Sequence, residues 1–580
     1  MPGVSLFHSK TPATNTNSTI ELDSLLFFDH YSETIVFEGQ SSAVGFTGYE
    51  SYPVATYETN DYLVLLEGHL YDVSDVRSAS LFVAKKLFNE DMEWLLEWLL
   101  DRDAEFVLVA VEKDSGDTVV LNDPLSRLPL YTYSDEDAIY LSREIAYILE
   151  TADVEPDSMG IAQYLLFGYP LGKRTLYDGV TQVPPASFIR LSDGEIRSQQ
   201  LSQIDIEAKR HADKSIDENA ARLSDLIASS VRRRASSGTN VVSLSGGLDS
   251  RALAACMTAN ELPYVAATYN RGAGTASEVQ AAEEVMSVLD GEWHEYQLEG
   301  PTAEYSDRLL ELKRGMNTVG MAYILEFFER LRSDFEDGIT YFTGDGGAKF
   351  SSWTPPRNFD SNDDIVEYLL ADQTRFSMEL VEKLSIHSRD EIEASIHERL
   401  ESYPESDAGQ RFVHFLIKER SLKWGYHGED RNRYYFWSAA PLYAYPVFEY
   451  AMSVPDSQKK QNKLYSRIIE SYSADVLDVS YVNYGAPVGS LEYKLKSLIY
   501  DLASKQPSLR ETLIKNFVRS DSKVDEVTAQ SIQDNAHIVD EYSNVLSPAT
   551  ISKFTDEETP PYSPKASKYL LTVLLVMNDL

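Results

Sequence analysis

The feature that most constrains the fold is the segment VVSLSGGLDSRALAA, residues 241–255. An apolar run of strand character ends in Ser-Gly-Gly, and an Ala-rich helical pattern follows at once. Gly246 and Gly247 permit a tight bend. The free N–H groups and the positive dipole end of the following helix favour an anion there. The competing interpretation is a tight turn that needs small residues but binds nothing. The neighbouring sequence is therefore needed to distinguish the two interpretations.

Strand and helix patterns alternate after this turn. The strand patterns are NVVSLS, YVAATYN, EWHEYQL and ITYFTGDGG, and helical patterns such as SEVQAAEEVMSVL separate them. This alternation predicts a parallel sheet in an α/β domain, in which ligands bind beyond the carboxyl ends of the strands. A second glycine-rich turn, Thr343 to Gly347, follows one of these strands. Two glycine loops are therefore expected to face one ligand.

The first 200 residues have the alternation of strands, as in SLLFFDH, TIVFEG, YLVLLEGHLYD, EFVLVAVEK, DTVVLND and AIYLS. Two helical patterns, SASLFVAKKLF and MEWLLEWLLD, interrupt them, and Asp193-Gly194 suits a hairpin turn. From about residue 362 to 580 the pattern is mostly helical. Because 580 residues exceed one core, we expect two domains, 1–205 and 206–580.

The chain carries 92 acidic and 52 basic residues, a net charge of −40, spread along its length. Such a charge disfavours nucleic acid and anionic lipid as partners. A well-solvated surface would explain it, but we favour adaptation to high internal salt, which places the protein in a salt-accumulating cytoplasm. The single Cys256 excludes an intrachain disulfide and a Cys-based metal site. No secretory-signal pattern or run of ~20 apolar residues appears, so a cytoplasmic location without a membrane is expected.

Several segments together resemble the asparagine synthetase family, which pairs a glutaminase-type domain with an ATP-pyrophosphatase synthetase domain. VVSLSGGLDSRALAA resembles the pyrophosphate loop and YFTGDGGAKF the second nucleotide loop, while LVLLEGHLYD and LNDPLSRLPLYTY resemble stretches of the N-terminal domain. The resemblance runs from residue 2 to about 490. It implies an α+β N-terminal domain with the layered sheets of N-terminal-nucleophile hydrolases. An α/β parallel-sheet domain with a largely helical C-terminal part would follow.

The resemblance also implies roles for particular residues. ATP would contact Leu244, Ser245, Gly246, Gly247, Asp249 and Ser250. Asp249 would reach Mg²⁺, Thr343 and Gly344 would line the adenine and ribose side, and Asp345 would take part in adenylation. The family activates a carboxylate as an acyl-adenylate, which an amine then attacks. The expected partners are thus a small carboxylate and an amine, and a homodimer is the candidate assembly.

The N-terminal domain departs from the family pattern. Pro2 stands where the family has its nucleophilic Cys, and a proline side chain offers no thiolate. The family's Asn-Gly-Glu reads Glu67-Gly68-His69, and a carboxylate at the first position would repel an oxyanion. Asp123 remains, although it would serve equally well to cap a turn. We therefore expect no glutamine hydrolysis.

The synthetase half departs less. Ala348 and Lys349 replace the usual Asp-Glu, so Lys349 is a candidate for neutralising phosphate, with an exposed loop lysine as the alternative. Trp437 and Ala439 replace a charged pair. Nearby Arg431 and Arg433 are weak site candidates, and Lys463 and Arg467 are either site residues or helix surface. The late loop VSYVNYGAPVG contains no Lys.

Two hypotheses follow. The first is an ATP-dependent amide-forming ligase that uses ammonia or a substrate amine. The second is a non-catalytic descendant that binds a nucleotide or a partner protein. The lost charges in the second loop and late loop favour the second hypothesis. The intact Ser-Gly-Gly-Leu-Asp-Ser favours the first, which we prefer.

Overall fold

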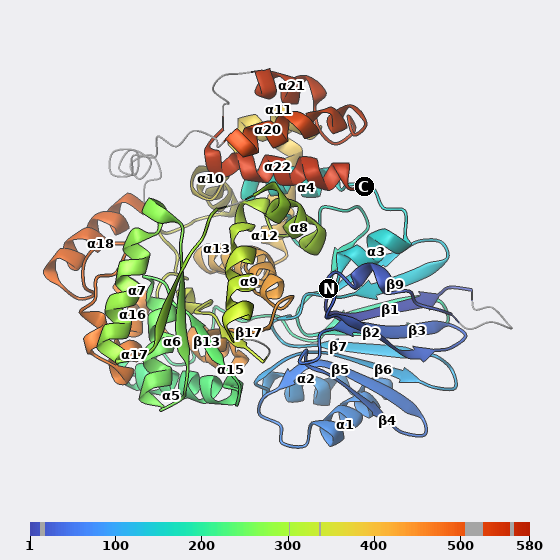
Figure 1. Cartoon of the computed structure of the whole chain (residues 1–580), viewed down its shortest axis with the longest axis horizontal. Coiled ribbons are helices and arrows are strands. Elements are labelled where there is room, and N and C mark those ends of the chain that lie inside the picture. Colours follow the sequence, from blue (N-terminus) through green and yellow to red (C-terminus); the bar gives the residue numbers. More distant parts are fainter. Residues whose placement is uncertain (12–17, 301, 336–337, 505–525, 557–561) are drawn as a thin grey trace.

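The computed structural model describes residues 1–11, 18–300, 302–335, 338–504, 526–556 and 562–580. In these residues two antiparallel six-stranded sheets form one side of the molecule and a parallel five-stranded sheet lies on the other (Figure 1). Helices from the C-terminal part cover the top of the view in Figure 1. Within this described part, no helix is both long enough and apolar enough to cross a bilayer.

The two antiparallel sheets come from the first 200 residues. The first has the order β10-β8-β9-β1-β3-β2, with strands β1 Gly3–Ser9, β2 Ser32–Glu38, β3 Ser42–Gly48, β8 Tyr131–Ser134, β9 Ala138–Ser142 and β10 Thr181–Gln182. The second has the order β12-β11-β7-β6-β5-β4, with strands β4 Val54–Glu58, β5 Tyr62–Leu70, β6 Ala104–Glu112, β7 Thr118–Asn122, β11 Ser187–Ser192 and β12 Glu195–Gln200. Their facing sides share one apolar core, to which Val4, Leu141, Val107 and Val120 contribute.

Helices cover the outer sides of this sheet pair. α1 Val76–Phe88 and α2 Met92–Leu100 pack on the second sheet, where Leu87 and Leu95 join Phe106 and Leu108 in one core. α3 Ile145–Thr151 lies against the first sheet. Strand β6 is buried along almost its whole length because both of its faces are covered. This explains why it reads as a nearly continuous apolar run.

The sequence-based predictions for this region are mostly confirmed. The expected strands and both helical patterns are present, and Asp193 and Gly194 link β11 to β12 with φ values of 52° and 74°. Positive φ at both turn positions is the geometry that Asp-Gly favours in a two-residue hairpin. The strand predicted at SLLFFDH is wrong, since only a short 3-10 helix, Asp23–Leu25, forms there. Its apolar side chains instead pack against distant aromatic rings, as Phe28 does against Tyr435 at 5.2 Å.

The parallel sheet has the order β15-β14-β13-β16-β17, with β13 Asn240–Ser243, β14 Val265–Asn270, β15 Trp293–Gln297, β16 Thr340–Phe342 and β17 Trp437–Ala439. Successive residues of its strands face opposite layers. Val242 and Phe342 join a core with α5 Ile216–Arg234, α6 Leu248–Ala259, α7 Ala276–Leu289 and α17 Lys463–Tyr472, whereas Val241 and Tyr341 face α8 Ala303–Lys313 and α9 Tyr323–Phe335. The strand order changes direction at β13, so ligand binding is expected between the ends of β13 and β16.

Most of the remaining described chain is helical. The helices are α10 Asn362–Asp372, α11 Met378–Leu384, α12 Arg389–Glu401, α13 Ala408–Phe415, the π-helix η5 Leu416–Gly425, α14 Tyr426–Asn432, α15 Tyr445–Met452, α16 Asp456–Lys459, α18 Leu491–Ser504, α20 Glu526–Asn535, α21 Pro548–Asp556 and α22 Pro564–Asn578. The last of these contacts α4 Ser158–Phe167 from the first third of the chain, and the Tyr164 and Tyr569 rings lie 5.6 Å apart. A helix from the first third of the chain is thus packed against the last helix (Figure 1).

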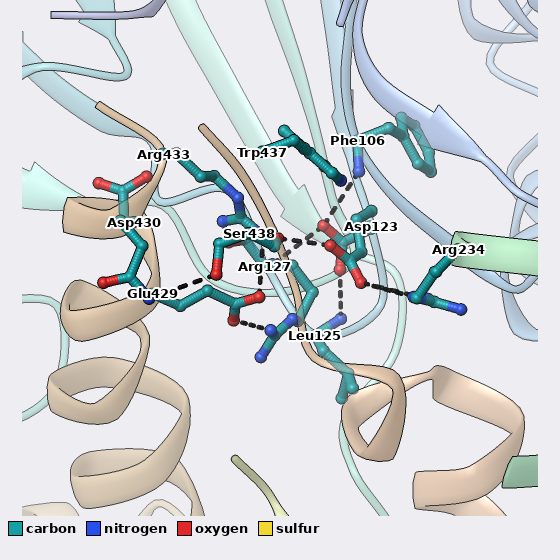
Figure 2. A network of polar contacts seen from close by, with 12 residues as sticks. Phe106, Asp123, Leu125, Arg127, Arg234, Glu429, Asp430, Arg433, Trp437 and Ser438 are labelled. Carbon is teal, nitrogen blue, oxygen red and sulfur yellow. Dashed lines mark hydrogen bonds and ion pairs between the residues drawn. The ribbon is translucent and has the colours of Figure 1, made fainter. Parts of the chain in front are cut away.

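Buried ion pairs join the antiparallel sheets to α14. Arg433 Nη2 lies 3.1 Å from Glu105 Oε2 on β6 and 3.3 Å from Glu429 Oε1 on α14, and Arg127 pairs with the same Glu429. Arg234 of α5 also reaches Glu105, at 3.1 Å. All five side chains are at least 95% buried. Figure 2 shows Arg127, Arg234, Glu429 and Arg433 from close by, with Glu429 on the tan helix.

A second group of buried charges lies beside the first. Arg143, which follows β9, places its Nε 2.9 Å from Glu67 Oε1 of β5 and its Nη2 2.5 Å from Asp430 Oδ1 of α14. Lys313 pairs with the other oxygen of Asp430. Burial would raise the pKa of Asp430, but Arg143 and Lys313 hold it below the usual value. We call these two groups together the interdomain ion network.

Removing one member of this network should destabilise the protein strongly. Arg433→Met leaves Glu105 and Glu429 buried with one cation fewer, and such a loss typically lowers the free energy of unfolding by about 3–5 kcal/mol. The matched control is Arg467→Met, because Arg467 pairs with Glu470 at the surface and is 53% exposed; its effect should stay within about 0.5 kcal/mol. The apparent Tm at one scan rate and KCl concentration checks this. Equal Tm values for the two variants would contradict the prediction.

Candidate active site

The two glycine loops meet at the carboxyl ends of neighbouring strands. β13 and β16 pair in parallel, with Val242 opposite Phe342, and the loops leave one residue further on. A Cβ placed on Gly344 would lie 2.5 Å from the Ser250 backbone nitrogen and 2.7 Å from the carbonyl carbon of Asp249. Such distances are too short for any side chain. The second loop therefore touches the first turn of α6, so the two glycine loops lie at the same edge of the sheet.

The first loop is organised by its own serines. The Ser245 backbone N–H donates to Ser250 Oγ at 3.0 Å, and the Gly247 N–H donates to Ser245 Oγ at 3.3 Å. Gly246 is pressed against the late loop, since a Cβ there would lie 2.1 Å from Val482 Cγ2. Helix α6 begins without a side-chain cap. The first-turn N–H groups of the helix thus remain suited to an anion.

Asp249 stands between the two loops. A Cβ on Gly347 would lie 1.9 Å from Asp249 Oδ1, so only glycine leaves room for this carboxyl group. Burial raises the pKa of Asp249 to about 6, and nearby Asp345 adds to the rise, although Tyr465 and Lys349 act in the opposite direction. The protein therefore disfavours the charge on Asp249 and does not fully compensate it.

Asp345 and Arg431 lie on the same side of the loops. Loss of hydration raises the pKa of Asp345, while Thr343, Arg127 and Arg431 partly offset this. Arg431 is buried and donates through Nη1 to Asn317 Oδ1 at 3.1 Å. In the described structure its Nε has no hydrogen-bond partner. The sequence-based candidate Arg431 thus lies near the loops.

Lys349 is not the exposed loop lysine that the sequence allowed. Its side chain is fully buried, and its Nζ donates to the carbonyl oxygens of Gly346 at 2.5 Å and Leu442 at 2.6 Å. Burial lowers its pKa well below the usual value, and only Asp249 raises it. Lys349 therefore holds the second loop and lies close to Asp249. Its position predicts structural support of the loop more than direct contact with a phosphate.

Arg251 was missed in the sequence analysis. It is fully buried, and its Nη1 donates to the carbonyl oxygens of Val476 and Val479 at 2.9 and 2.8 Å. Its Nη2 reaches Ser480 O at 3.1 Å. It thereby ties the late loop to the helix that follows the first glycine loop. A charged residue inside the Ala-rich stretch RALAAC was the available signal.

A pocket of about 600 Å³ opens beside the loops. One of its walls is Tyr481, whose pKa burial and the charge of Asp249 raise to about 12. Among the described lining residues the only charged one is Lys460. The others are Ser351, Ser352, Thr354, Pro355, Pro356, Gln461, Asn462, Tyr481, Asn483, Tyr484, Tyr493, Ser497 and Tyr500. Hydroxyl, amide and aromatic groups thus prevail in a chain that is otherwise strongly acidic.

The residues present fit a nucleoside triphosphate with Mg²⁺. The first-turn amides of α6 and the Ser245 and Ser250 hydroxyls suit phosphate oxygens. Asp249 supplies one incompletely compensated carboxylate, and Mg²⁺ at phosphates commonly uses one or two carboxylates. In the described residues no group of three His, Cys, Asp or Glu side chains could hold a metal alone. A cation here would therefore need the phosphates as ligands.

The other sequence candidates lie elsewhere. Arg433 belongs to the interdomain ion network, and Trp437 donates from Nε1 to Tyr71 Oη at 3.0 Å within the antiparallel-sheet core. Ala439 is buried and accepts the Thr343 N–H at 3.0 Å. Lys463 is exposed, and Arg467 is paired at the surface. Both therefore belong to the helix surface, which was one of the two alternatives.

The first residues of β1 pack against two members of the interdomain ion network, Arg143 and Glu67. A Cβ on Gly3, the residue after the buried Pro2, would lie 2.5 Å from Arg143 Cβ. Glu67 is fully buried there, accepts the Val4 N–H at 2.9 Å and pairs with Arg143. The interdomain ion network therefore fills this region.

Asp123 serves as the turn cap that the sequence suggested. Its Oδ1 accepts the Leu125 N–H at 2.9 Å and its Oδ2 the Arg127 N–H at 3.0 Å (Figure 2). Burial raises the pKa of Asp123 to about 6. Both carboxyl oxygens are thus engaged in the turn that positions Arg127.

One stretch of the chain matches the model of a known family. Residues 222–320 match the family model described as asparagine synthase. This stretch begins within α5, contains the first glycine loop, and ends before the second. No curated protein gives a significant match to the sequence.

Among solved structures, three similarities cover large parts of the known chains. Glutamine phosphoribosylpyrophosphate amidotransferase from B. subtilis, complexed with ADP and GMP, is 12% identical with a TM-score of 0.22, over 72% of this chain and 97% of that chain. NMN synthetase from Francisella tularensis is 15% identical with a TM-score of 0.19, over 38% and 96%. The allosteric regulatory enzyme of purine biosynthesis is 13% identical with a TM-score of 0.19, over 72% and 90%. These values are too low to transfer any property.

Asp249→Asn should stabilise the protein at neutral pH. The native carboxyl keeps its proton up to pH about 6, whereas an ordinary Asp ionises near 3.8. Stability therefore falls as pH rises from about 4 to 6, and the penalty is complete above pH 6. The variant avoids this penalty, so its Tm should rise by a few degrees at pH 7.5, and the gain should fall to about half by pH 5.0.

Asp123→Asn is the matched control. Asp123 has a similarly raised pKa, but an amide NH₂ in its place would face the N–H donors of Leu125 or Arg127. This variant should lose stability at pH 7.5. Thermal unfolding of both variants at the two pH values checks the pair. A lower Tm for Asp249→Asn at pH 7.5 would show that the Asp249 charge is compensated.

Proposed function

We propose that this protein is an ATP-dependent ligase that forms a carbon–nitrogen bond. It would activate a carboxylate as an acyl-adenylate and use ammonia or a substrate amine, not glutamine. The observation that carries the proposal is the contact of the two glycine loops at the ends of β13 and β16, with Asp249 between them. In this proposal residues 206–580 form the synthetase unit, and residues 1–205 form a supporting unit without glutaminase activity.

The first loop would bind the phosphates of ATP. Gly246 and Gly247 let the backbone approach, the first-turn amides of α6 donate to phosphate oxygens, and Ser245 and Ser250 add hydroxyl groups. Leu244 is buried at the end of the strand and positions this turn. Thr343 and Gly344 would line the adenine and ribose side.

Asp249 would hold the Mg²⁺ that binds with ATP. When bound, this cation neutralises charge on the phosphates. A cation beside Asp249 also removes the mismatch that raises its pKa. Lys349 would keep the Gly346–Gly347 turn in place and would act as a positioning residue.

The proposed reaction has two steps. A carboxylate oxygen attacks the α-phosphorus of ATP, the bond to the bridging α–β oxygen breaks, and pyrophosphate leaves. The amine nitrogen then attacks the acyl carbon, the carbon–oxygen bond to AMP breaks, and one N–H proton must be removed. Asp345, in the second loop and with a raised pKa, would accept this proton.

The second candidate is nucleotide binding without turnover. The engagement of Lys349 by two carbonyl oxygens favours it, because two of the three donors of this side chain are already used within the protein. The loop at Tyr481 also offers no lysine. The uncompensated charge of Asp249 speaks against it, since a site without function gains stability by losing that carboxylate.

Incubation with Mg-ATP, ammonium, high KCl and a panel of carboxylic acids should release AMP and pyrophosphate in equal amounts. Asp249→Ala should lower this rate by at least about 100-fold, because charge stabilisation at the phosphates is the main catalytic task. Asp225→Ala, at an exposed position of α5, is the matched control and should keep the rate. Release of ADP would contradict adenylation, and binding of ATP without turnover across the panel would favour the second candidate.

Glutamine should not replace ammonium in the same assay. Glu67, at the position of the family's Asn, carries a carboxylate that is paired with Arg143, and Pro2 has no nucleophilic side chain. No glutamate should form from glutamine, with or without Mg-ATP and acid. Formation of glutamate at a rate matching AMP release would overturn our interpretation of the N-terminal domain.

A further inference from the structure

A second pocket, remote from the glycine loops, lies where the antiparallel-sheet part meets the helical part. Its volume is about 170 Å³, which leaves room for several water molecules. One wall comes from loops of the first 205 residues, including Ser126, Lys173 and Gln182. The other wall comes from α12 and the π-helix η5, including Arg399, Lys418 and Lys423. We call it the junction pocket.

The charge of the junction pocket is opposite to that of the whole protein. It is lined by Lys173, Arg399, Lys418 and Lys423, and no Asp or Glu is found among its described lining residues. The chain as a whole carries 92 acidic against 52 basic residues. Four cations around one small cavity therefore need an explanation beyond surface composition.

Internal partners do not account for these cations. Arg399 pairs through Nε with the buried Glu419 at 2.6 Å, and Lys423 Nζ donates to the carbonyl oxygens of Gly172 and Arg174 at 3.0 and 2.5 Å. Within the described part of the chain, neither Lys418 Nζ nor Lys173 Nζ makes a hydrogen bond or an ion pair. Of the four positive side chains that line the pocket, only Arg399 therefore forms an ion pair within the described structure.

The electrostatic consequence is that the lysines repel one another. Burial lowers the pKa of Lys418, Arg399 and Lys173 lower it further, and Glu419 and Glu405 only partly compensate. The same pattern holds for Lys423. Burial, Arg399 and Arg174 lower its pKa to about 7, against Glu419 and Asp157. A bound anion would reverse this repulsion.

A further observation indicates a binding pocket. Lys418 and Lys423 are presented by a π-helix, a rare conformation that often occurs at functional sites.

We propose that the junction pocket binds a phosphate group, either as the free ion or carried by a small metabolite. Tetrahedral phosphate oxygens can accept from several ammonium groups at once, and charge-assisted bonds of this kind are strong. A planar carboxylate would engage fewer of the four cations. The proposal does not depend on the ligase activity proposed above.

The pocket is also connected to the glycine loops. Ser126 lines it, and the next residue, Arg127, lies with its guanidinium 4.6 Å from the Tyr443 ring centroid. The Lys349 ammonium lies 4.8 Å from the same ring. Arg127 and Tyr443 thus form a chain of contacts between the wall of the junction pocket and Lys349, the lysine that holds the second loop.

Isothermal titration calorimetry on the full chain tests the proposal, with potassium phosphate replacing KCl at constant ionic strength. The probes are inorganic phosphate and glycerol 3-phosphate, which distinguish a free ion from an esterified phosphate by their relative affinity. Lys173→Met with Lys418→Met should weaken both probes by at least about tenfold. This double variant should remain folded, because neither ammonium group makes a hydrogen bond or an ion pair in the described structure, and Lys418 loses only its contact with the Tyr403 ring, whose centroid is 5.9 Å away.

The matched control is Lys85→Met with Lys383→Met, which removes the same charge from exposed positions on α1 and α11 and should leave the affinity unchanged. Ser250→Ala distinguishes the junction pocket from the glycine loop. Loss of phosphate binding in Ser250→Ala, with full binding in Lys173→Met/Lys418→Met, would assign the anion to the loop and overturn the proposal. Absence of phosphate binding to the unaltered protein would also overturn it.

Discussion

The arrangement of this molecule depends on buried ion pairs between α14 and the antiparallel sheets. Three charged residues of one short segment, Glu429, Asp430 and Arg433, meet partners from the first 150 residues of the chain. Buried charges are tolerated only when they are paired, so the two parts cannot shift without leaving some of them uncompensated. The same pairs hold Arg127 against Tyr443 and close to the second glycine loop.

The interdomain ion network also includes a residue that departs from the family pattern. Glu67 stands where the resemblance places an Asn, and its pair with Arg143 connects β5 to Asp430 on α14. This position of the N-terminal part thus takes part in the attachment between the two halves. In our proposal the N-terminal domain therefore contributes position and stability to the synthetase site but supplies no ammonia.

The two candidate sites both depart from what stability alone would favour. Asp249 is a carboxylate whose surroundings raise its pKa to about 6. Its carboxyl group lies so close to residue 347 that only glycine fits at that position. Lys418 and Lys423 gather positive charge in a cavity of a strongly acidic protein. Unfavourable electrostatics of this kind persist where a ligand supplies the missing charge, which is the physical reason for proposing ligands at both places.

The sequence by itself determined the local structures of the site. The strand, glycine turn and helix at 240–259, the second loop and the Asp193-Gly194 hairpin follow from periodicity and backbone sterics, which act over a few residues. Alternation of strands and helices was enough to bring both loops to one sheet edge. Only the tertiary structure decided which side chains are buried and with whom: it placed Phe28 against Tyr435 instead of in a strand, and it buried Lys349 and Arg251. These outcomes depend on groups hundreds of residues apart, whose meeting leaves no periodic signal in the chain.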